Sequence, residues 1–178
     1  MTASELSKVI APYIPGEKNG RRNFLPLYAD PRTMDRILTY LAEPFRGKID
    51  LVVSPEPLGF ILGSMMAREL GTGFVALRKG RDYFDEDKDT IFASYIDHHN
   101  NVQCLAVMKD LIPAGSHVLI VDDYIGTAAT MQSCLTILEE AGASAVGIAS
   151  LGACYRRVTR EMIDSGMVHC ICRISAEA

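Results

Sequence analysis

The chain has 178 residues, which is enough for one hydrophobic core and short for two domains. Its net charge of −4 argues against a general nucleic-acid-binding surface. No run of about 18 apolar residues would cross a membrane, and the first residues lack the basic start and apolar stretch of a secretory signal. We therefore expect a single domain spanning 1–178, located in the cytoplasm, with neither nucleic-acid nor membrane partners.

The five cysteines are an odd number at wide spacings. Cys170 and Cys172 form only a C-x-C pair, and no two further ligands stand at a spacing suited to zinc. These spacings favour reduced thiols in a cytosolic protein over disulfides or a metal site.

The first third of the chain begins with a predicted helix over 3–11, followed by turn-rich residues up to 30. Asp30-Pro31 starts a second helix, because proline suits the first helical turn. The β-branched apolar run IDLVVS then predicts a buried strand. Residues 58–70 predict a helix that is stopped by Gly71.

After a predicted strand over 73–80, the pattern breaks down between residues 81 and 101. This stretch is acidic, aromatic and aperiodic, and we interpret it mainly as a long mobile loop, with a β-hairpin as the alternative. Strands that alternate with helices predict an α/β fold with a mostly parallel central sheet flanked by helices. The remaining predicted elements are strands over 102–108, 117–123, 145–154 and 168–175 and helices over 130–141 and 157–165.

The stretch VLIVDDYIGTAATM, residues 118–131, places two aspartates at the end of the clearest strand. Ligands of such sheets bind beyond the carboxyl ends of the strands, where Asp122 and Asp123 stand. Neighbouring carboxylates suit vicinal ribose hydroxyls, or a hydrated Mg²⁺ carried in with the substrate. On its own, an acidic pair after an apolar strand is also typical of helix caps and of response-regulator acids.

The loop over 126–130 that follows the aspartates combines small residues with hydroxyls. The free N–H groups and positive dipole end of the next helix would face this loop, and small residues let an anion approach the backbone. Thr127 and Thr130 add hydroxyl donors. Acids for the hydroxyls and a loop for the phosphate together predict a site for a 5-phosphoribosyl group.

This stretch resembles the phosphoribosyl-pyrophosphate motif of type I phosphoribosyltransferases, in which apolar residues precede D-D, two more residues and A-T-G-G-T. A second block, LVVSPEPLGFILGSMMARELGTGFVALRKG over 51–80, is similar to a segment of adenine phosphoribosyltransferases with a V-V-G-x-E-S-R-G-F core. FLPLYADP is a weaker third match, to the D-x-T-P-L-L-A-D segment of that branch. The three blocks fall in the family's order and cover most of the chain.

The resemblance implies the type I phosphoribosyltransferase fold, with residues 1–30 forming an N-terminal hood and 81–101 a mobile lid that shuts out water. It also implies a reaction of purine salvage, in which a nucleobase displaces pyrophosphate from phosphoribosyl pyrophosphate with Mg²⁺ as cofactor. The adenine branch is the closest match, and its members imply a homodimer.

The site residues are carried over by position from the family's motifs. Asp122 and Asp123 are the implied catalytic residues at the ribose, and they are also the candidate contacts of Mg²⁺. The implied 5-phosphate loop consists of Gly126, Thr127, Ala128, Ala129 and Thr130. The implied pyrophosphate-binding residues are Glu56, Pro57, Leu58, Gly59, Arg78 and Lys79, and the lid contributes Ser94 and Tyr95.

Two departures from the family pattern bear on catalysis. The two glycines of the phosphate loop are Ala128 and Ala129 here, and alanine resists a positive φ, so we expect phosphate binding only if both positions are right-handed. The arginine of E-S-R-G-F is Leu58, which removes a charged partner for pyrophosphate. Glu56-Pro57 still allows an unusual peptide geometry, because X-Pro bonds adopt cis far more readily than others.

These departures leave a second hypothesis open, a non-catalytic protein of the same fold that binds phosphoribosyl pyrophosphate or a nucleotide. A receiver-like domain is a third and weaker one, since no separate phosphoacceptor aspartate is evident. Within the enzyme class, hypoxanthine, xanthine and orotate are alternatives to adenine. We interpret His98-His99 as a polar turn rather than a metal pair, and the acidic residues of 81–101 as a solvated loop.

Overall fold

The computed structural model describes residues 2–11, 24–80, 89–97, 100–155 and 157–175. In order along the chain, these residues form α1 (Ala3–Ile10), α2 (Pro31–Ala42), β1 (Leu51–Pro55), α3 (Gly59–Leu70), β2 (Gly73–Lys79), β3 (Thr90–Ile96), β4 (Val102–Met108), β5 (His117–Ile125), α4 (Ala129–Ala141), β6 (Ser144–Tyr155), α5 (Arg157–Asp164) and β7 (Val168–Ser175). None of the helices in these ranges has the length and apolar content needed to cross a membrane.

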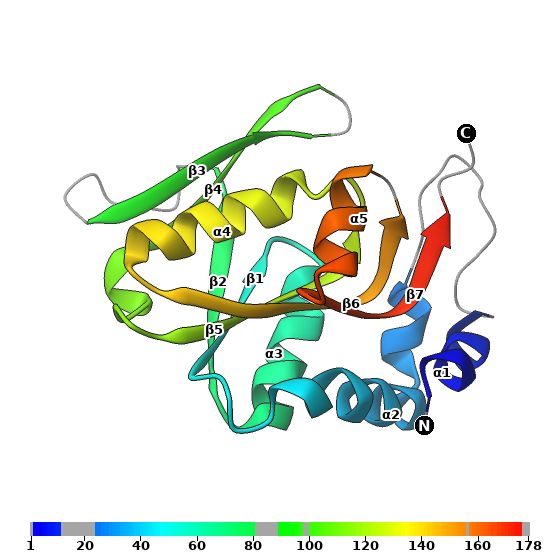
Figure 1. Cartoon of the computed structure of the whole chain (residues 1–178). Coiled ribbons are helices and arrows are strands. Elements are labelled where there is room, and N and C mark those ends of the chain that lie inside the picture. The colour runs from blue at the N-terminus through cyan, green and yellow to red at the C-terminus, as the bar shows by residue number, and fades with distance from the viewer. Residues whose placement is uncertain (1, 12–23, 81–88, 98–99, 156, 176–178) are drawn as a thin grey trace.

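A seven-stranded sheet in the order β3-β4-β2-β1-β5-β6-β7 forms the middle of the molecule (Figure 1). The four strand pairs from β2 through β1, β5 and β6 to β7 are parallel. Only β4 runs antiparallel to both of its neighbours, β2 and β3. The predicted α/β fold with a mostly parallel sheet is therefore confirmed, and the parallel part places β1, β2 and β5 with their carboxyl ends at one edge.

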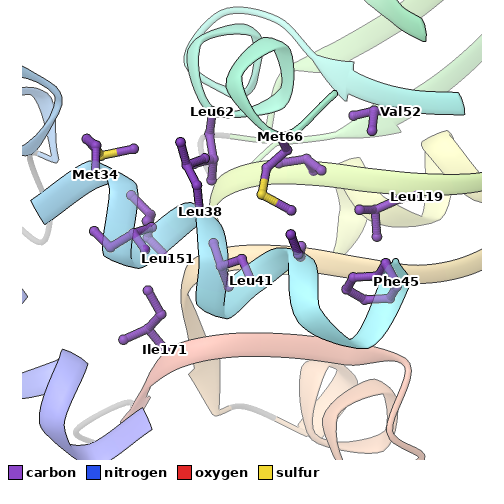
Figure 2. Close-up of a cluster of buried hydrophobic side chains, with 14 of the residues drawn as sticks. Met34, Leu38, Leu41, Phe45, Val52, Leu62, Met66, Leu119, Leu151 and Ile171 are labelled. Atoms are coloured by element: carbon purple, nitrogen blue, oxygen red, sulfur yellow. The ribbon is translucent and has the colours of Figure 1, made fainter. Parts of the chain in front are cut away.

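Apolar side chains cover both faces of the sheet, because successive residues of a strand point to opposite sides. On one face, α2 and α3 pack onto residues such as Val52, Leu119 and Leu151, and Figure 2 shows the α2 side chains directed at this cluster. On the other face, α4 packs onto Val53 and Ile120. The two clusters fix the register of the central strands and thereby the position of everything attached to their ends.

Local sequence signals place the ends of the helices. The Asp30 carboxylate accepts hydrogen bonds from the N–H groups of Arg32 and Thr33 at the start of α2, which begins with a proline. Gly71 ends α3 in the left-handed conformation at φ 70°, as predicted. Near the N-terminus, α1 packs against β7 and α2.

The expectation of a long loop over 81–101 is wrong for Thr90–Ile96, which form β3, and the hairpin alternative holds for this part. Ile91 and Ala93 are buried against the α4 face of the molecule, and this alternation of buried and exposed positions is a strand pattern. The acidic residues before it obscure the pattern in the sequence. Residues 81–88 and His98-His99 lie outside the described residues.

Gly63 marks the closest approach of α3 to the sheet. A Cβ atom at this position would lie 2.9 Å from Cβ of Ser54 and 3.0 Å from a ring carbon of Phe74. Ser54 and Gly63 are both buried, so neither surface has room to move. The absence of a side chain at Gly63 thus lets α3 seat against β1 and hold the loop between them.

We predict that Gly63→Ala lowers the free energy of unfolding by about 1–3 kcal/mol, because overpacking must push α3 away from β1. Denaturant unfolding would measure the change. Ser64→Ala is the matched control, since Ser64 is the exposed neighbour on the same helix and should change stability by less than about 0.5 kcal/mol. Equal effects of the two substitutions would contradict the close approach.

Candidate active site

Two adjacent carboxyl groups stand at the carboxyl end of β5. Asp122 and Asp123 follow the buried run that ends at Val121, and both are partly buried themselves. The backbone N–H of Asp123 donates to Oδ1 of Asp122 at 2.9 Å, and Oγ of Ser150 on the neighbouring strand donates to the carbonyl oxygen of Asp123 at 3.1 Å. The pair is therefore fixed to the sheet at the edge where ligands of parallel sheets bind.

The surroundings of this pair disfavour negative charge. Burial raises the pKa of the Asp122 carboxyl well above its ordinary value, and the neighbouring charge of Asp123 raises it further, while Lys79 acts in the opposite direction. Burial also raises the pKa of Asp123. A ligand that brings hydroxyl donors or a cation to these carboxylates would offset the cost of ionising them.

The tyrosine Tyr28, which lies in a 3₁₀ helix over Leu25–Ala29, was not among the residues that sequence reasoning selected. Its hydroxyl is buried and has no hydrogen-bond partner among the described residues. Burial raises the pKa of the Tyr28 phenol, and the negative charges of Asp123 and Asp122 raise it further. The only feature of the sequence that pointed to Tyr28 is its position two residues before Asp30, which caps α2.

The loop after the acidic pair turns through Ala128, which has φ 62° and ψ −5° in the left-handed region. Helix α4 then begins at Ala129, and Gln132 N–H donates to the Ala128 carbonyl at 2.9 Å. The condition set for phosphate binding, that both alanines be right-handed, is met at Ala129 and fails at Ala128. The helix itself begins at Ala129, so the left-handed Ala128 leaves the N–H donors of the first turn of α4 in place. Ala128 keeps the left-handed turn that glycine adopts easily, because the short connection from β5 to α4 imposes it.

The start of α4 is open to a ligand. No side chain among the described residues caps it, so the N–H groups of its first turn remain available as donors. Thr127 is exposed, and Gly126 and Thr130 are partly exposed. The uncapped turn and the acidic pair lie on one connection between β5 and α4, so the structure brings these predicted residues together.

A second loop, between β1 and α3, carries the residues predicted to bind pyrophosphate. Its Glu56-Pro57 peptide bond is cis, which agrees with the unusual geometry expected there. The Glu56 carboxylate accepts from the backbone N–H of Lys79 at 2.9 Å and pairs with Nε of Arg78 at 3.2 Å. Glu56 thus connects the loop to the end of β2. Because its carboxylate is negatively charged, its role is to orient Arg78 and not to contact the pyrophosphate.

The two loops meet at Gly59, the first residue of α3. A Cβ atom here would lie 3.0 Å from Oδ1 of Asp122 and 3.3 Å from the carbonyl oxygen of Val121. Leu58 precedes it as the residue before the helix, without a side-chain cap, and it is partly buried. Glycine at this position therefore lets the second loop approach the acidic pair, and Leu58 brings no charge to the junction.

The lid residues Ser94 and Tyr95 lie on β3 instead of in a loop. Ser94 is exposed, whereas Tyr95 is half-buried and packs against the apolar cluster that contains Cys134 and Ile137 of α4. Among the described residues, no group of three or more histidine, cysteine or acidic side chains could hold a metal ion by itself. The two aspartates offer oxygen ligands for Mg²⁺ only if other oxygens come from elsewhere.

The sequence comparisons and the structure comparison with known proteins point to one and the same family. The sequence profile of the "Phosphoribosyl transferase domain" matches residues 28–178. The chain is 36% identical to the adenine phosphoribosyltransferase of Bifidobacterium longum over 129 residues, which cover 71% of this chain and 65% of that protein. It is 35% identical to the adenine phosphoribosyltransferase of Thermobifida fusca over 131 residues, covering 73% and 72%.

The fold also matches solved structures over nearly its whole length. The crystal structure of adenine phosphoribosyltransferase from Rhodothermus marinus superimposes with a TM-score of 0.81 at 27% sequence identity, covering 96% of this chain and 99% of that one. In sequence, the chain spans just under two thirds of the Bifidobacterium longum protein, 65% of its length.

We predict that Asp122→Asn raises the free energy of unfolding at pH 7 by about 1–2 kcal/mol, because asparagine avoids ionising a buried carboxyl. Since the folded-state pKa lies above the unfolded one, the wild-type chain loses stability as the pH rises through this range. The advantage of the variant should therefore vanish below about pH 4. Denaturant unfolding between pH 4 and 8 measures it, with the exposed Asp35→Asn as control. A destabilised Asp122→Asn at neutral pH would contradict this environment.

The adjacent alanines should respond oppositely to glycine. Ala128→Gly should raise the free energy of unfolding by about 1 kcal/mol, because it removes the left-handed strain. Ala129→Gly should lower it by about 0.5–1 kcal/mol, because Ala129 is helical. Thermal or denaturant unfolding of both variants gives the comparison, and a loss of stability in both would show that Ala128 is not left-handed.

Proposed function

The chain belongs to the type I phosphoribosyltransferase family, and on that premise we propose that it transfers the 5-phosphoribosyl group of phosphoribosyl pyrophosphate to adenine, releasing pyrophosphate. The adenine specificity is supported by relatives that carry this name at 35–36% identity. The product of the proposed reaction is a purine nucleoside monophosphate, which places the chain in purine nucleotide metabolism.

One observation carries the proposal: a partly buried acidic pair and an uncapped helix start share the connection from β5 to α4. Asp122 and Asp123 would accept hydrogen bonds from the two ribose hydroxyls, which are donors matched to neighbouring carboxylates. The N–H groups of the first turn of α4 would bind the 5-phosphate. The ribose hydroxyls and the 5-phosphate of one ligand would therefore be bound by residues that lie close together along the backbone.

The second loop supplies the positive charge for the leaving group. Arg78 and Lys79 at the end of β2 would lie near the pyrophosphate, and Glu56 would hold the arginine in place through its pair with Nε. The same carboxylate accepts the Lys79 N–H and so fixes the backbone of the lysine. As carbon C1 gains positive charge in the transition state, Asp122 and Asp123 would stabilise it electrostatically.

We propose that Mg²⁺ enters with phosphoribosyl pyrophosphate. The site fits an ion that is held mainly by substrate oxygens, because the described residues offer two neighbouring carboxylates and no larger ligand group. When bound, Mg²⁺ neutralises the negative charge that develops on the pyrophosphate.

We also propose a homodimer in the cytoplasm. What supports the dimer is the family resemblance, together with large apolar side chains that stay exposed among the described residues, such as Ile61 on α3. What supports the cytoplasm is the set of five free cysteines, which a reducing compartment maintains.

The proposal predicts that purified protein releases pyrophosphate from phosphoribosyl pyrophosphate and Mg²⁺ when adenine is added. Hypoxanthine, guanine, xanthine and orotate, tested in parallel, should give far less release. The double variant Asp122→Asn/Asp123→Asn is the control, and it should lower the rate by at least about 100-fold because it removes the electrostatic stabilisation of C1.

A calorimetric titration of phosphoribosyl pyrophosphate on the same sample separates the remaining outcomes. Binding without release from any base would overturn the proposed enzyme and favour the non-catalytic alternative, for which Leu58 is the residue to examine. Release with a base other than adenine would overturn the specificity alone. No binding at millimolar ligand would exclude both functions.

A further inference from the structure

A buried serine, Ser150, stands level with the acidic pair on the neighbouring strand. β6 lies beside β5 in the sheet (Figure 1), and the register pairs Asp122 with Ser150 and Tyr124 with Gly152. The Ser150 side chain is fully buried. Burying a hydroxyl is unfavourable unless it is hydrogen-bonded, so the contacts of this group explain what serine does at this position.

The Ser150 hydroxyl connects β5 to the end of β6. Its Oγ donates to the carbonyl oxygen of Asp123 at 3.1 Å and to the carbonyl oxygen of Gly152 at 2.8 Å, and it accepts from the backbone N–H of Gly152 at 3.3 Å. A hydroxyl has one proton, so the two carbonyl oxygens share it in a bifurcated hydrogen bond. The peptide group of Asp123 is therefore held to β6 by a side chain.

Asp123 is thereby fixed on both sides of its Cα atom. Its N–H donates to Oδ1 of Asp122 at 2.9 Å, and its carbonyl oxygen accepts from Ser150. Because peptide groups are planar, holding the N–H and the C=O also fixes the direction of the Cα–Cβ bond of Asp123. That direction decides where the carboxylate reaches, so Ser150 acts on the acidic group without touching the ligand.

Burial alone does not produce such contacts. Ser54 on β1 is as completely buried as Ser150, yet its hydroxyl has no hydrogen-bond partner among the described residues. The three contacts of Ser150 are thus particular to its place beside the acidic pair.

We propose that Ser150 is a positioning residue for the ribose: its buried hydroxyl holds the Asp123 peptide against β6 and thereby directs the Asp123 carboxylate at the ribose hydroxyls of the ligand. This inference rests on the proposed function, because it deepens the ribose end of that site. Loss of the Ser150 hydroxyl should therefore weaken contacts to the ribose and leave contacts to the 5-phosphate intact.

Two ligands separate this role from a general loss of stability. Ribose 5-phosphate carries both the hydroxyls and the phosphate, whereas inorganic phosphate occupies the phosphate end alone. In NMR titrations of the full chain, Ser150→Ala should raise Kd for ribose 5-phosphate about three- to tenfold, the scale of one hydrogen bond, and should change Kd for inorganic phosphate by less than about twofold. Ser133→Ala, at a buried serine on α4, is the matched control and should change neither Kd.

A pair of variants of nearly equal shape keeps the test valid if Ser150→Ala disturbs the fold. Ser150→Thr keeps the hydroxyl and Ser150→Val lacks it, and both β-branched side chains suit a strand. Any overpacking is common to the two, so only Ser150→Val should raise Kd for ribose 5-phosphate. When Asp123→Ala is added to each, the two should agree within about twofold, because the carboxylate that Ser150 positions is gone.

Two results would overturn the positioning role. One is an equal Kd for ribose 5-phosphate in Ser150→Thr and Ser150→Val, and the other is a rise in Kd for inorganic phosphate in Ser150→Ala that matches the rise for ribose 5-phosphate. Both can occur while the wild-type chain binds phosphoribosyl pyrophosphate and turns it over, so the proposed function would stand. If the wild-type chain binds neither ribose 5-phosphate nor phosphoribosyl pyrophosphate, the proposed function and the positioning role both fall.

Discussion

Two adjacent, partly buried carboxyl groups at the end of β5 are the constraint on which the rest of the site depends. Burial raises the pKa of both, and at Asp122 the charge of Asp123 adds to the effect. Lys79 acts in the opposite direction on Asp122. The folded chain therefore holds these groups at a cost in stability, as functional sites commonly do. A ligand with neighbouring hydroxyls and an accompanying cation would relieve that cost.

The backbone around the pair is arranged so that several segments meet there. Gly59 brings the start of α3 against Asp122, since a Cβ atom would leave only 3.0 Å to the carboxylate. Glu56 ties the same loop to the end of β2 through Arg78 and Lys79. Ala128 accepts a left-handed conformation so that α4 begins directly beyond the acids. All three features bring their segments to the carboxyl end of the sheet. The conformational preferences of the individual residues alone do not explain them.

The sequence predicted what is encoded in continuous local patterns. The apolar run of β5 and the acids at its end, the cap at Gly71 and the order of the strands and helices other than β3 are as expected. The strand β3 was expected only as the alternative to a loop, because its burial depends on α4, which lies far along the chain. The left-handed conformation of Ala128 could not be predicted from the sequence, because the connection to α4 overrides the preference of alanine. The contacts of Glu56 and the position of Tyr28 likewise depend on the three-dimensional fold, so the sequence alone did not predict them.

A crystal structure of the chain with bound ribose 5-phosphate tests the central claim most directly. We predict that the two ribose hydroxyls lie within hydrogen-bonding distance of the carboxylates of Asp122 and Asp123. The phosphate should accept hydrogen bonds from N–H groups of the first turn of α4, with Ala128 still at a positive φ. A phosphate bound away from residues 126–130, or a ribose that leaves both carboxylates without contacts, would contradict the assignment of this site.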